Sequence, residues 1–388
     1  MVAPRPTART SLRVAGLFAG IGGIELGLSR GGHATTLLCE NDPGANAVLD
    51  KHFPDIERST DIRTLAALPR GTDLLTAGFP CQDLSQAGAT RGIDGDKSGL
   101  VTHVFRLLRK SEVPWVLIEN VPFMLRLGRG AAMDYIATSL ERLGYRWAYR
   151  VIDTRAFGLP QRRERVFILA SLEEEPSGRL LGSNREPAPA TDHRGRPCGF
   201  YWTEGIRGLG WAVDAVPTLK GGSTIGIPSP PALWMPDGRF VTPDIRDAER
   251  MQGFRMDWTK PAEAVTRVGH RWKLVGNAVT VDVVEWIAGQ LRKDGHPTPI
   301  AAAGKIEGTW PDAGFGSREG RFAVDATSWP VARRSQPIEE FLKFEPRDLS
   351  LKAISGFERR LSSSSLRAPD EFRSALKRRI QTLTRSNG

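Results

Sequence analysis

Short apolar runs alternate with helical patterns over the first part of the chain, from Leu12 to Ser171. Each run has the length of one strand, and several are separated by segments with apolar residues at helical spacing. This alternation is typical of βαβ units, so we expect an α/β fold built on a mostly parallel sheet. The predicted strands are 12–18, 34–40, 73–79, 115–121, 147–153 and 166–170, and the predicted helices are one ending near residue 30, 100–110 and 131–143.

Glycine and proline become frequent between residues 172 and 243, where they supply 21 of 72 residues against 68 of 388 in the whole chain. Both residue types interrupt regular elements, so this region is predicted to be an irregular, loop-built module. Helical periodicity returns at 244–253 and 281–292. We therefore expect a catalytic domain formed by 1–171 and 244–292, a second domain at 172–243, and a C-terminal extension at 293–388.

The role of this extension is left open by its sequence. Residues 331–388 hold 13 basic and 7 acidic side chains, and residues 371–383 are predicted to form a basic amphipathic helix. Such a helix could contact the phosphates of a nucleic acid, pair with another protein or cover the core.

Basic residues outnumber acidic ones by 54 to 44, which gives a net charge of +10 and a pI near 9.8. A polyanion is therefore a more suitable partner than an acidic protein. A hydrophobic content of 40% and a mean hydropathy of −0.29 exclude a disordered, collagen-like or membrane protein. Three widely spaced cysteines argue against a disulfide framework and for a reducing compartment, so a cytoplasmic protein is expected.

A glycine-rich turn, Phe18-Ala-Gly-Ile-Gly-Gly23, lies between the first predicted strand and the first helix. Glycines at such a place let the backbone turn tightly and approach a cofactor. Glu25 stands where a dinucleotide-binding turn has its third glycine, so a nucleoside pocket is favoured over a pyrophosphate site. Glu40 ends the second predicted strand, where a carboxylate can accept hydrogen bonds from ribose hydroxyls.

Polar side chains with catalytic potential lie at the ends of three further predicted strands. Cys81 comes two residues after the strand 73–79, and Glu119 lies near the end of the strand 115–121. Arg163 and Arg165 precede the strand 166–170 and share one face because side chains alternate along an extended chain. The carboxyl ends of parallel strands meet at one edge of a sheet, so we expect Cys81 and Glu119 to lie together. Cys39 and Cys198 are interpreted as structural.

The ordered set of motifs resembles the DNA (cytosine-5)-methyltransferase family of the restriction-modification type. The set comprises Phe-x-Gly-x-Gly-Gly at 18–23, Pro-Cys-Gln at 80–82, Glu-Asn-Val at 119–121, Gln-Arg-Arg-Glu-Arg at 161–165, Arg-Asp-Ala-Glu-Arg-Met-Gln-Gly-Phe at 246–254 and Gly-Asn-Ala-Val at 276–279. The resemblance implies a Rossmann-like class I sheet and places a target recognition domain at 172–243. It also implies S-adenosyl-L-methionine as cofactor and duplex DNA as substrate.

The chemistry implied by the resemblance begins with addition of the Cys81 thiolate to carbon 6 of a cytosine flipped out of the duplex. Carbon 5 then becomes nucleophilic enough to accept a methyl group. Arg163 would favour the thiolate, Glu119 would hydrogen-bond or protonate ring nitrogen 3, and Arg165 would hold the carbonyl oxygen of the base. The sequence names no residue for removing the carbon 5 proton.

The resemblance also assigns binding residues. Those expected at the cofactor are Phe18, Gly20, Ile21, Gly22, Gly23, Glu40, Asp61, Ile62, Pro80, Leu100, Asn277 and Val279. Those expected at DNA are Gln82, Ser85, Arg194, Arg196, Arg207, Thr218, Lys220 and Arg239. Asn41 departs from relatives that carry an aromatic residue for the adenine. Five aromatic residues at 200–202, 211 and 234 are interpreted as the core of the small module.

Other functions are weighed against this one. A cytosine-5 tRNA methyltransferase uses the same scaffold, but the Cys-Phe-Thr tripeptide of that branch is missing. A nicotinamide oxidoreductase is disfavoured by Glu25, and a non-catalytic DNA-binding relative is disfavoured by Cys81, Glu119 and Arg163. A monomer without metal ions is expected, with a cognate restriction endonuclease as a functional partner and no membrane association.

Overall fold

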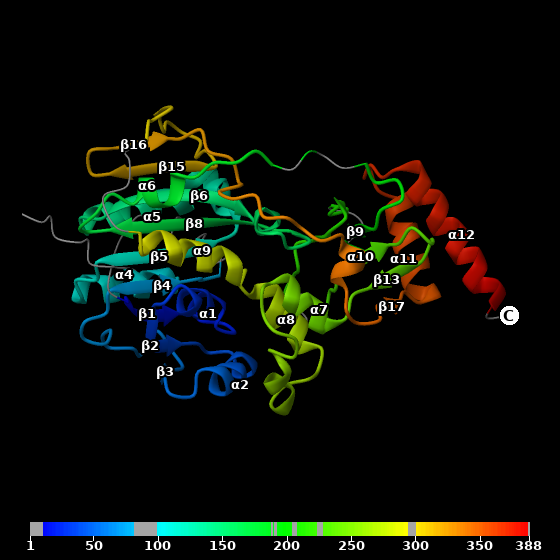
Figure 1. The fold of residues 1–388 in the computed structure, drawn as a ribbon, viewed down its shortest axis with the longest axis horizontal. Coiled ribbons are helices and arrows are strands. Elements are labelled where there is room, and N and C mark those ends of the chain that lie inside the picture. Colours follow the sequence, from blue (N-terminus) through cyan, green and yellow to red (C-terminus); the bar gives the residue numbers. More distant parts are fainter. Residues whose placement is uncertain are drawn as a thin grey trace, which may run out of the picture.

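The computed structural model describes residues 11–80, 99–187, 189, 192–203, 208–222, 228–293 and 300–386. These residues form two bodies along the long axis of the molecule (Figure 1). One is a large sheet with helices on both faces, and the other is a small sheet next to the last helices of the chain. The predicted α/β fold class is confirmed.

Ten described strands form the large sheet, and one half of it is parallel. Across this half the order is β3 (Glu57–Ser59), β2 (Ala34–Cys39), β1 (Arg13–Leu17), β4 (Leu74–Ala77) and β5 (Trp115–Asn120). The motif residues at 18, 40 and 119 all lie at or just beyond the carboxyl ends of these strands. The parallel half is therefore the part that builds the site.

The other half of the large sheet is antiparallel, so the expectation of a mostly parallel sheet is wrong there. Its strands, continuing from β5, are β8 (Glu164–Ser171), β6 (Arg146–Asp153), β15 (Ala313–Ser317), β16 (Gly320–Ala323) and β14 (Gly304–Lys305). The connection 154–163 between β6 and β8 is too short for a crossover helix, so these two strands have to pair antiparallel.

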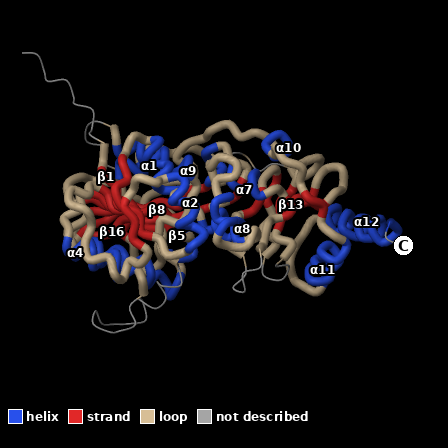
Figure 2. Tube along the Cα trace, turned by 90° about the horizontal axis from the view of Figure 1, so that it is seen from below, coloured by secondary structure: helices blue, strands red, loops and turns tan. Residues whose placement is uncertain are grey.

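Helices cover both faces of the large sheet because side chains of successive strand residues point to opposite faces. Ile118 packs with Val104 and Ile136 on one face, whereas Leu117 packs with Leu28 and Val284 on the other. The first layer contains α4 (Val101–Lys110) and α5 (Ala131–Arg142). The second contains α1 (Gly23–Arg30), α6 (Ser177–Leu181) and α9 (Val281–Leu291), and Figure 2 shows α1 and α9 on the side opposite α4.

Short strands build the second sheet, and its last strand comes from the C-terminal region. Phe200, Phe240, Phe357 and Phe372 form a buried aromatic core on this sheet, with ring centroids 5.0–6.2 Å apart. The strands are β10 (Ala212–Val213), β9 (Cys198–Phe200), β12 (Ala232–Trp234), β13 (Phe240–Thr242) and β17 (Arg347–Asp348).

The C-terminal region is shared between the two bodies. Strands β14, β15 and β16 extend the large sheet. Helices α11 (Leu351–Ser362) and α12 (Asp370–Ser386) pack on the small sheet, and α12 runs to the far end of the molecule (Figure 1). The predicted helix at 371–383 is thus confirmed, and its apolar residues Phe372, Ala375 and Leu376 cover the core of the small sheet.

The remaining helices lie close to the junction of the two bodies (Figure 1). They are α2 (Pro43–His52), α7 (Ile245–Met251), α8 (His270–Asn277) and α10 (Ile338–Phe341). A two-stranded parallel pair, β7 (Gln161–Arg162) with β11 (Val216–Pro217), joins the bodies directly. Within the described ranges, no helix combines the length and apolar character needed to cross a membrane.

Candidate active site

The glycine-rich turn between β1 and α1 adopts a conformation that few residue types tolerate. Phe18, Gly20 and Gly22 have φ angles of 55°, 56° and 81°, in the left-handed region. Glycine enters this region without steric cost, whereas Phe18 is strained there. At Gly23 a Cβ atom would lie only 2.9 Å from the carbonyl oxygen of Val279. The absence of a side chain therefore allows α1 to pack closely against the segment that connects α8 to α9.

Glu40 follows β2 and is held by three backbone N–H groups. Its Oε2 accepts a hydrogen bond from Gly20 at 2.7 Å, and its Oε1 accepts hydrogen bonds from Asn41 and Asp42, each at 2.8 Å. These bonds fix the carboxylate beside the glycine turn. Each carboxylate oxygen has two lone pairs, so Glu40 can still accept hydrogen bonds from the hydroxyls of a ligand.

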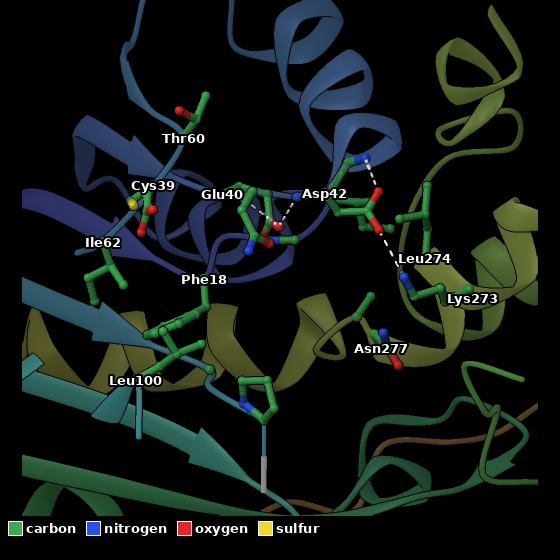
Figure 3. Close-up of a pocket in the computed structure, with 18 of the residues that line it drawn as sticks. Phe18, Cys39, Glu40, Asp42, Thr60, Ile62, Leu100, Lys273, Leu274 and Asn277 are labelled. Carbon is green, nitrogen blue, oxygen red and sulfur yellow. Dashed lines mark hydrogen bonds and ion pairs between the residues drawn. The ribbon is translucent and has the colours of Figure 1, made fainter. Parts of the chain in front are cut away.

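A cavity of about 440 Å³ lies against this turn. Figure 3 shows Glu40 near its middle, Ile62 and Leu100 towards one end, and Lys273, Leu274 and Asn277 towards the other. Of the expected cofactor residues, the following line it: Phe18, Gly20, Ile21, Glu40, Asp61, Ile62, Pro80, Leu100 and Asn277. Gly22, Gly23 and Val279 lie in the surrounding backbone and do not line the cavity.

Sequence reasoning missed several lining residues, most importantly Asp42 and Lys273. Asp42 is the N-cap of α2 and is followed by Pro43, which is a recognisable helix start. Lys273 precedes Asn277 by four positions and therefore shares its face of α8. Both signals were present in the sequence. The other missed lining residues are Cys39, Ala45, Thr60, Arg63, Gly78, Leu274 and Ala278.

Glu119, at the end of β5, forms an ion pair with Arg165 of β8. The Arg165 Nε and the Glu119 Oε1 are 3.1 Å apart, and both side chains are largely buried. Burial raises the pKa of the Glu119 carboxyl, while the positive charges of Arg165 and Arg163 oppose this rise. A carboxyl group with a raised pKa is suited to donating a proton.

The Glu119 carboxylate also lies next to the chain that leads towards Cys81. A Cβ atom on Gly78 would lie 3.5 Å from Glu119 Oε2. The side-chain amide of Asn120 donates a hydrogen bond to the carbonyl oxygen of Phe79 at 3.0 Å, which fastens the ends of β4 and β5 together. The described chain continues to Pro80. Cys81, Gln82 and Ser85 lie outside the described residues, and their assigned roles stay predictions.

Arg163 is fully buried and holds three backbone carbonyls. Its guanidinium donates hydrogen bonds to Leu219 at 3.1 Å, to Gly276 at 3.2 Å and to Ala278 at 2.6 Å. Burial lowers the pKa of Arg163, the positive charge of Arg165 lowers it further, and Glu119 opposes both effects. Arg163 thus fastens the segment around Leu219 to the C-terminal end of α8, a connecting role that its sequence context did not reveal.

Two of the residues expected at DNA lie close to this cluster. The hydroxyl of Thr218 donates to the carbonyl oxygen of Arg162 at 2.9 Å, and the Lys220 ammonium lies 3.8 Å from the ring centroid of Tyr201. The Tyr201 hydroxyl donates to the carbonyl oxygen of Thr218 at 2.8 Å. Tyr201, interpreted from the sequence as core, therefore lies at the edge of the site.

The remaining residues expected at DNA lie in the small body or outside the described residues. Arg194 pairs with Asp192, Arg196 with Asp214, and Arg239 with both Asp237 and Glu345. Arg207 is not among the described residues.

A left-handed glycine turn, an oriented carboxylate after β2 and a cavity at the carboxyl ends of parallel strands define an α/β protein with a ligand cavity at the usual place for this fold. The family model for C-5 cytosine-specific DNA methylase matches residues 12–194. Type II methyltransferase M2.BsuMI of Bacillus subtilis is 47% identical over 386 residues, covering 95% of this chain and 98% of the relative. The chain belongs to the C-5 cytosine-specific DNA methylase family.

Solved structures agree with the fold. The methyltransferase EhMeth of Entamoeba histolytica has a TM-score of 0.52 at 15% identity, and Dnmt2 methyltransferase of S. pombe has a TM-score of 0.51 at 17% identity. These matches cover 73% and 72% of this chain, respectively, and 98% of each solved chain. M2.BsuMI, in contrast, matches nearly the full length.

Proposed function

We propose that this protein transfers a methyl group to carbon 5 of a cytosine in a specific duplex DNA sequence, as the modification enzyme of a restriction-modification system. Family membership and the similarity to a type II methyltransferase support this function. A cognate endonuclease acting on the same site, a cytoplasmic location and a monomeric enzyme complete the proposal.

The observation that carries the proposal is the Glu119–Arg165 pair beside Gly78. Only two residues, Phe79 and Pro80, separate Gly78 from Cys81, so a cytosine held by Glu119 and Arg165 would lie within reach of the Cys81 thiolate. The acid, the cation and the nucleophile then surround one pyrimidine ring. No such arrangement is needed for DNA binding alone.

The reaction follows from these groups. The Cys81 thiolate adds to carbon 6, the electrons of the carbon 5–carbon 6 double bond move into the ring, and Glu119 gives its proton to nitrogen 3. Arg165 holds the carbonyl oxygen of the base. After methylation at carbon 5, the nitrogen 3 proton returns to Glu119 and a base removes the carbon 5 proton. The electron pair of that carbon–hydrogen bond re-forms the carbon 5–carbon 6 double bond, and the carbon–sulfur bond breaks to restore the Cys81 thiolate.

S-adenosyl-L-methionine would supply the activated methyl group when bound in the cavity. Glu40 is placed to accept hydrogen bonds from the ribose, and Phe18, Ile62 and Leu100 provide apolar surface for the adenine. On the DNA side, Thr218 and Lys220 are the recognition residues nearest the catalytic pair. Gln82, Ser85, Arg194, Arg196, Arg207 and Arg239 are proposed to contact the duplex around them.

The test replaces Cys81 by Ala and measures tritium transfer from labelled S-adenosylmethionine to DNA. Loss of at least 10⁴-fold in transfer is expected, as for the loss of an essential nucleophile, with binding of S-adenosylhomocysteine unchanged. Cys198→Ala is the matched control and should retain activity, because Cys198 is buried in the small sheet. Retained transfer in Cys81→Ala would reject the mechanism, and preference for tRNA over duplex DNA would reject the substrate.

A further inference from the structure

The cofactor cavity has two chemically different ends. Phe18, Ile62 and Leu100 supply apolar surface towards one end, whereas Asp42, Lys273 and Asn277 supply polar groups towards the other (Figure 3). Glu40 lies between them (Figure 3). A ligand that fills this cavity should therefore carry a flat apolar group, a hydroxylated middle and a charged tail.

The charged end is organised around Asp42. The Lys273 ammonium donates a hydrogen bond to Asp42 Oδ2 at 3.0 Å, and His270 Nε2 lies 3.0 Å from Asp42 Oδ1. Oδ1 also accepts hydrogen bonds from the backbone N–H groups of Gly44 and Ala45 at the start of α2. Asp42 thus fastens α8, which carries Lys273 and His270, to the start of α2.

The Asp42 carboxylate remains ionised in this arrangement. Burial acts to raise its pKa, but the hydrogen bonds from Lys273 and His270 outweigh burial and lower the pKa below its ordinary value. An ionised Asp42 restricts the Lys273 side chain to the wall of the cavity. The ammonium has three donors and Asp42 receives one of them, so it can bind a second acceptor.

Two cationic side chains line the described cavity, Arg63 and Lys273. Arg63 binds the Asp61 carboxylate through both its Nε and an Nη atom, and it extends from the segment that also carries Ile62. Lys273 is 45% exposed and belongs to the polar end. A carboxylate in that end needs a cationic partner to replace its hydration, and Lys273 supplies one.

We propose that Lys273 binds the carboxylate of the amino-acid portion of the cofactor, and that Asp42 is the positioning residue that holds Lys273 for this contact. The inference rests on the proposed function, since it takes S-adenosylmethionine as the ligand. It adds to that function a residue that binds the amino-acid end of the cofactor, which is the end furthest from the adenine.

The test compares two ligands that share the adenosine thioether but differ in the tail. S-adenosylhomocysteine carries the amino-acid carboxylate, and 5′-methylthioadenosine lacks it. Their dissociation constants are measured by titration calorimetry with the full chain and with Lys273→Met, which keeps the length of the side chain but removes its charge. Arg63→Met is the matched control, because it removes the other cation that lines the same cavity.

In Lys273→Met the dissociation constant of S-adenosylhomocysteine should rise at least tenfold, as expected for the loss of a hydrogen bond between charged groups. That of 5′-methylthioadenosine should stay within twofold, which also shows that the variant is folded. Arg63→Met should change both constants by the same factor. Lys273→Arg, which retains a cation, should restore most of the affinity for S-adenosylhomocysteine.

Two results would overturn the assignment of Lys273: an unchanged affinity of Lys273→Met for S-adenosylhomocysteine, or an equal loss for both ligands. Failure of the proposed function looks different, because the unmodified chain would then bind neither adenosine compound. If Lys273→Met did not fold, Lys273→Gln would be measured with the same pair of ligands and judged by the same criteria.

Discussion

The large and small sheets bury their apolar faces in different ways. In the large sheet, much of the cover is local: α1 follows β1 directly, and α4 leads into β5. In the small sheet the strands have two or three residues, and their cover, α11 and α12, comes from the far end of the chain. Such short strands cannot bury enough area by themselves. The small body is therefore built from two distant parts of the sequence.

Arg163 connects the two bodies, and removing it should have the largest effect on stability. Arg163→Met leaves the carbonyls of Leu219, Gly276 and Ala278 without their donor, which should lower the free energy of unfolding by on the order of 5 kcal/mol. Urea unfolding followed by tryptophan fluorescence measures this loss.

Arg165→Met is the control for that experiment. Arg165 pairs with Glu119, and the Glu119 carboxyl can take up a proton and become neutral when its partner is removed. Its removal should raise the pKa of Glu119 further and abolish methyl transfer, with a much smaller effect on stability. Equal destabilisation by the two variants would contradict the connecting role of Arg163.

Phe372 tests whether the small sheet depends on the C-terminal helices. Phe372→Ala removes a ring that contacts Phe200, Phe240 and Phe357, so a loss of about 3–5 kcal/mol is expected. Duplex binding should weaken while S-adenosylhomocysteine binding persists, because no residue that lines the described cavity comes from the small sheet, α11 or α12. Phe123→Ala, at a ring that is 61% exposed, should be nearly neutral. Simultaneous loss of both binding activities would refute the separation of the bodies.

The buried Glu25 carboxyl makes the stability of the large body depend on pH. It is buried beside Gly16 and Thr76, and burial raises its pKa from 4.5 to about 7. Because the folded pKa exceeds the unfolded value, stability is greatest below about pH 4.5 and falls as the pH rises to about 7. The full loss is at most about 3 kcal/mol.

Glu25→Gln should therefore be more stable than the unmodified chain at pH 8, and this advantage should shrink at pH 5. Urea unfolding at both pH values gives the difference. Glu307→Gln, at an exposed position, provides the control. If the free energy of unfolding depended on pH in the same way in Glu25→Gln and in the unmodified chain, ionisation of Glu25 would not destabilise the folded protein.

The smallest expected change in the free energy of unfolding is for a substitution at the start of α11. The Ser350 hydroxyl accepts a hydrogen bond from the backbone N–H of Ala353 at 3.3 Å, so Ser350→Ala should cost about 1 kcal/mol. Ser365→Ala, at an exposed position between α11 and α12, should cost less. If the two variants had the same unfolding midpoint in urea, the cap would contribute nothing to the cover of the small sheet.

Arg163 and Arg165 illustrate how far sequence reasoning reaches. They are two positions apart, and the resemblance implies that Arg163 favours the Cys81 thiolate and that Arg165 holds the carbonyl oxygen of the base. The sequence predicts that their side chains lie on the same face of an extended chain. It does not predict that the carbonyl groups of residues 219, 276 and 278 accept hydrogen bonds from Arg163. Local spacing carries no information about such distant partners, so the different roles of the two arginines emerge only in three dimensions.

Local patterns along the chain are sufficient to predict the parallel half of the large sheet and the positions of Glu40 and Glu119 at the ends of their strands, because periodicity and strand ends are local properties. Motifs in a fixed order likewise predict the family. The antiparallel half, the cover of the small sheet and the pairing of Lys273 with Asp42 are visible only in the folded structure. Each of these joins segments that are remote along the chain, and the free energy that selects such contacts arises only when the folded chain brings their surfaces together.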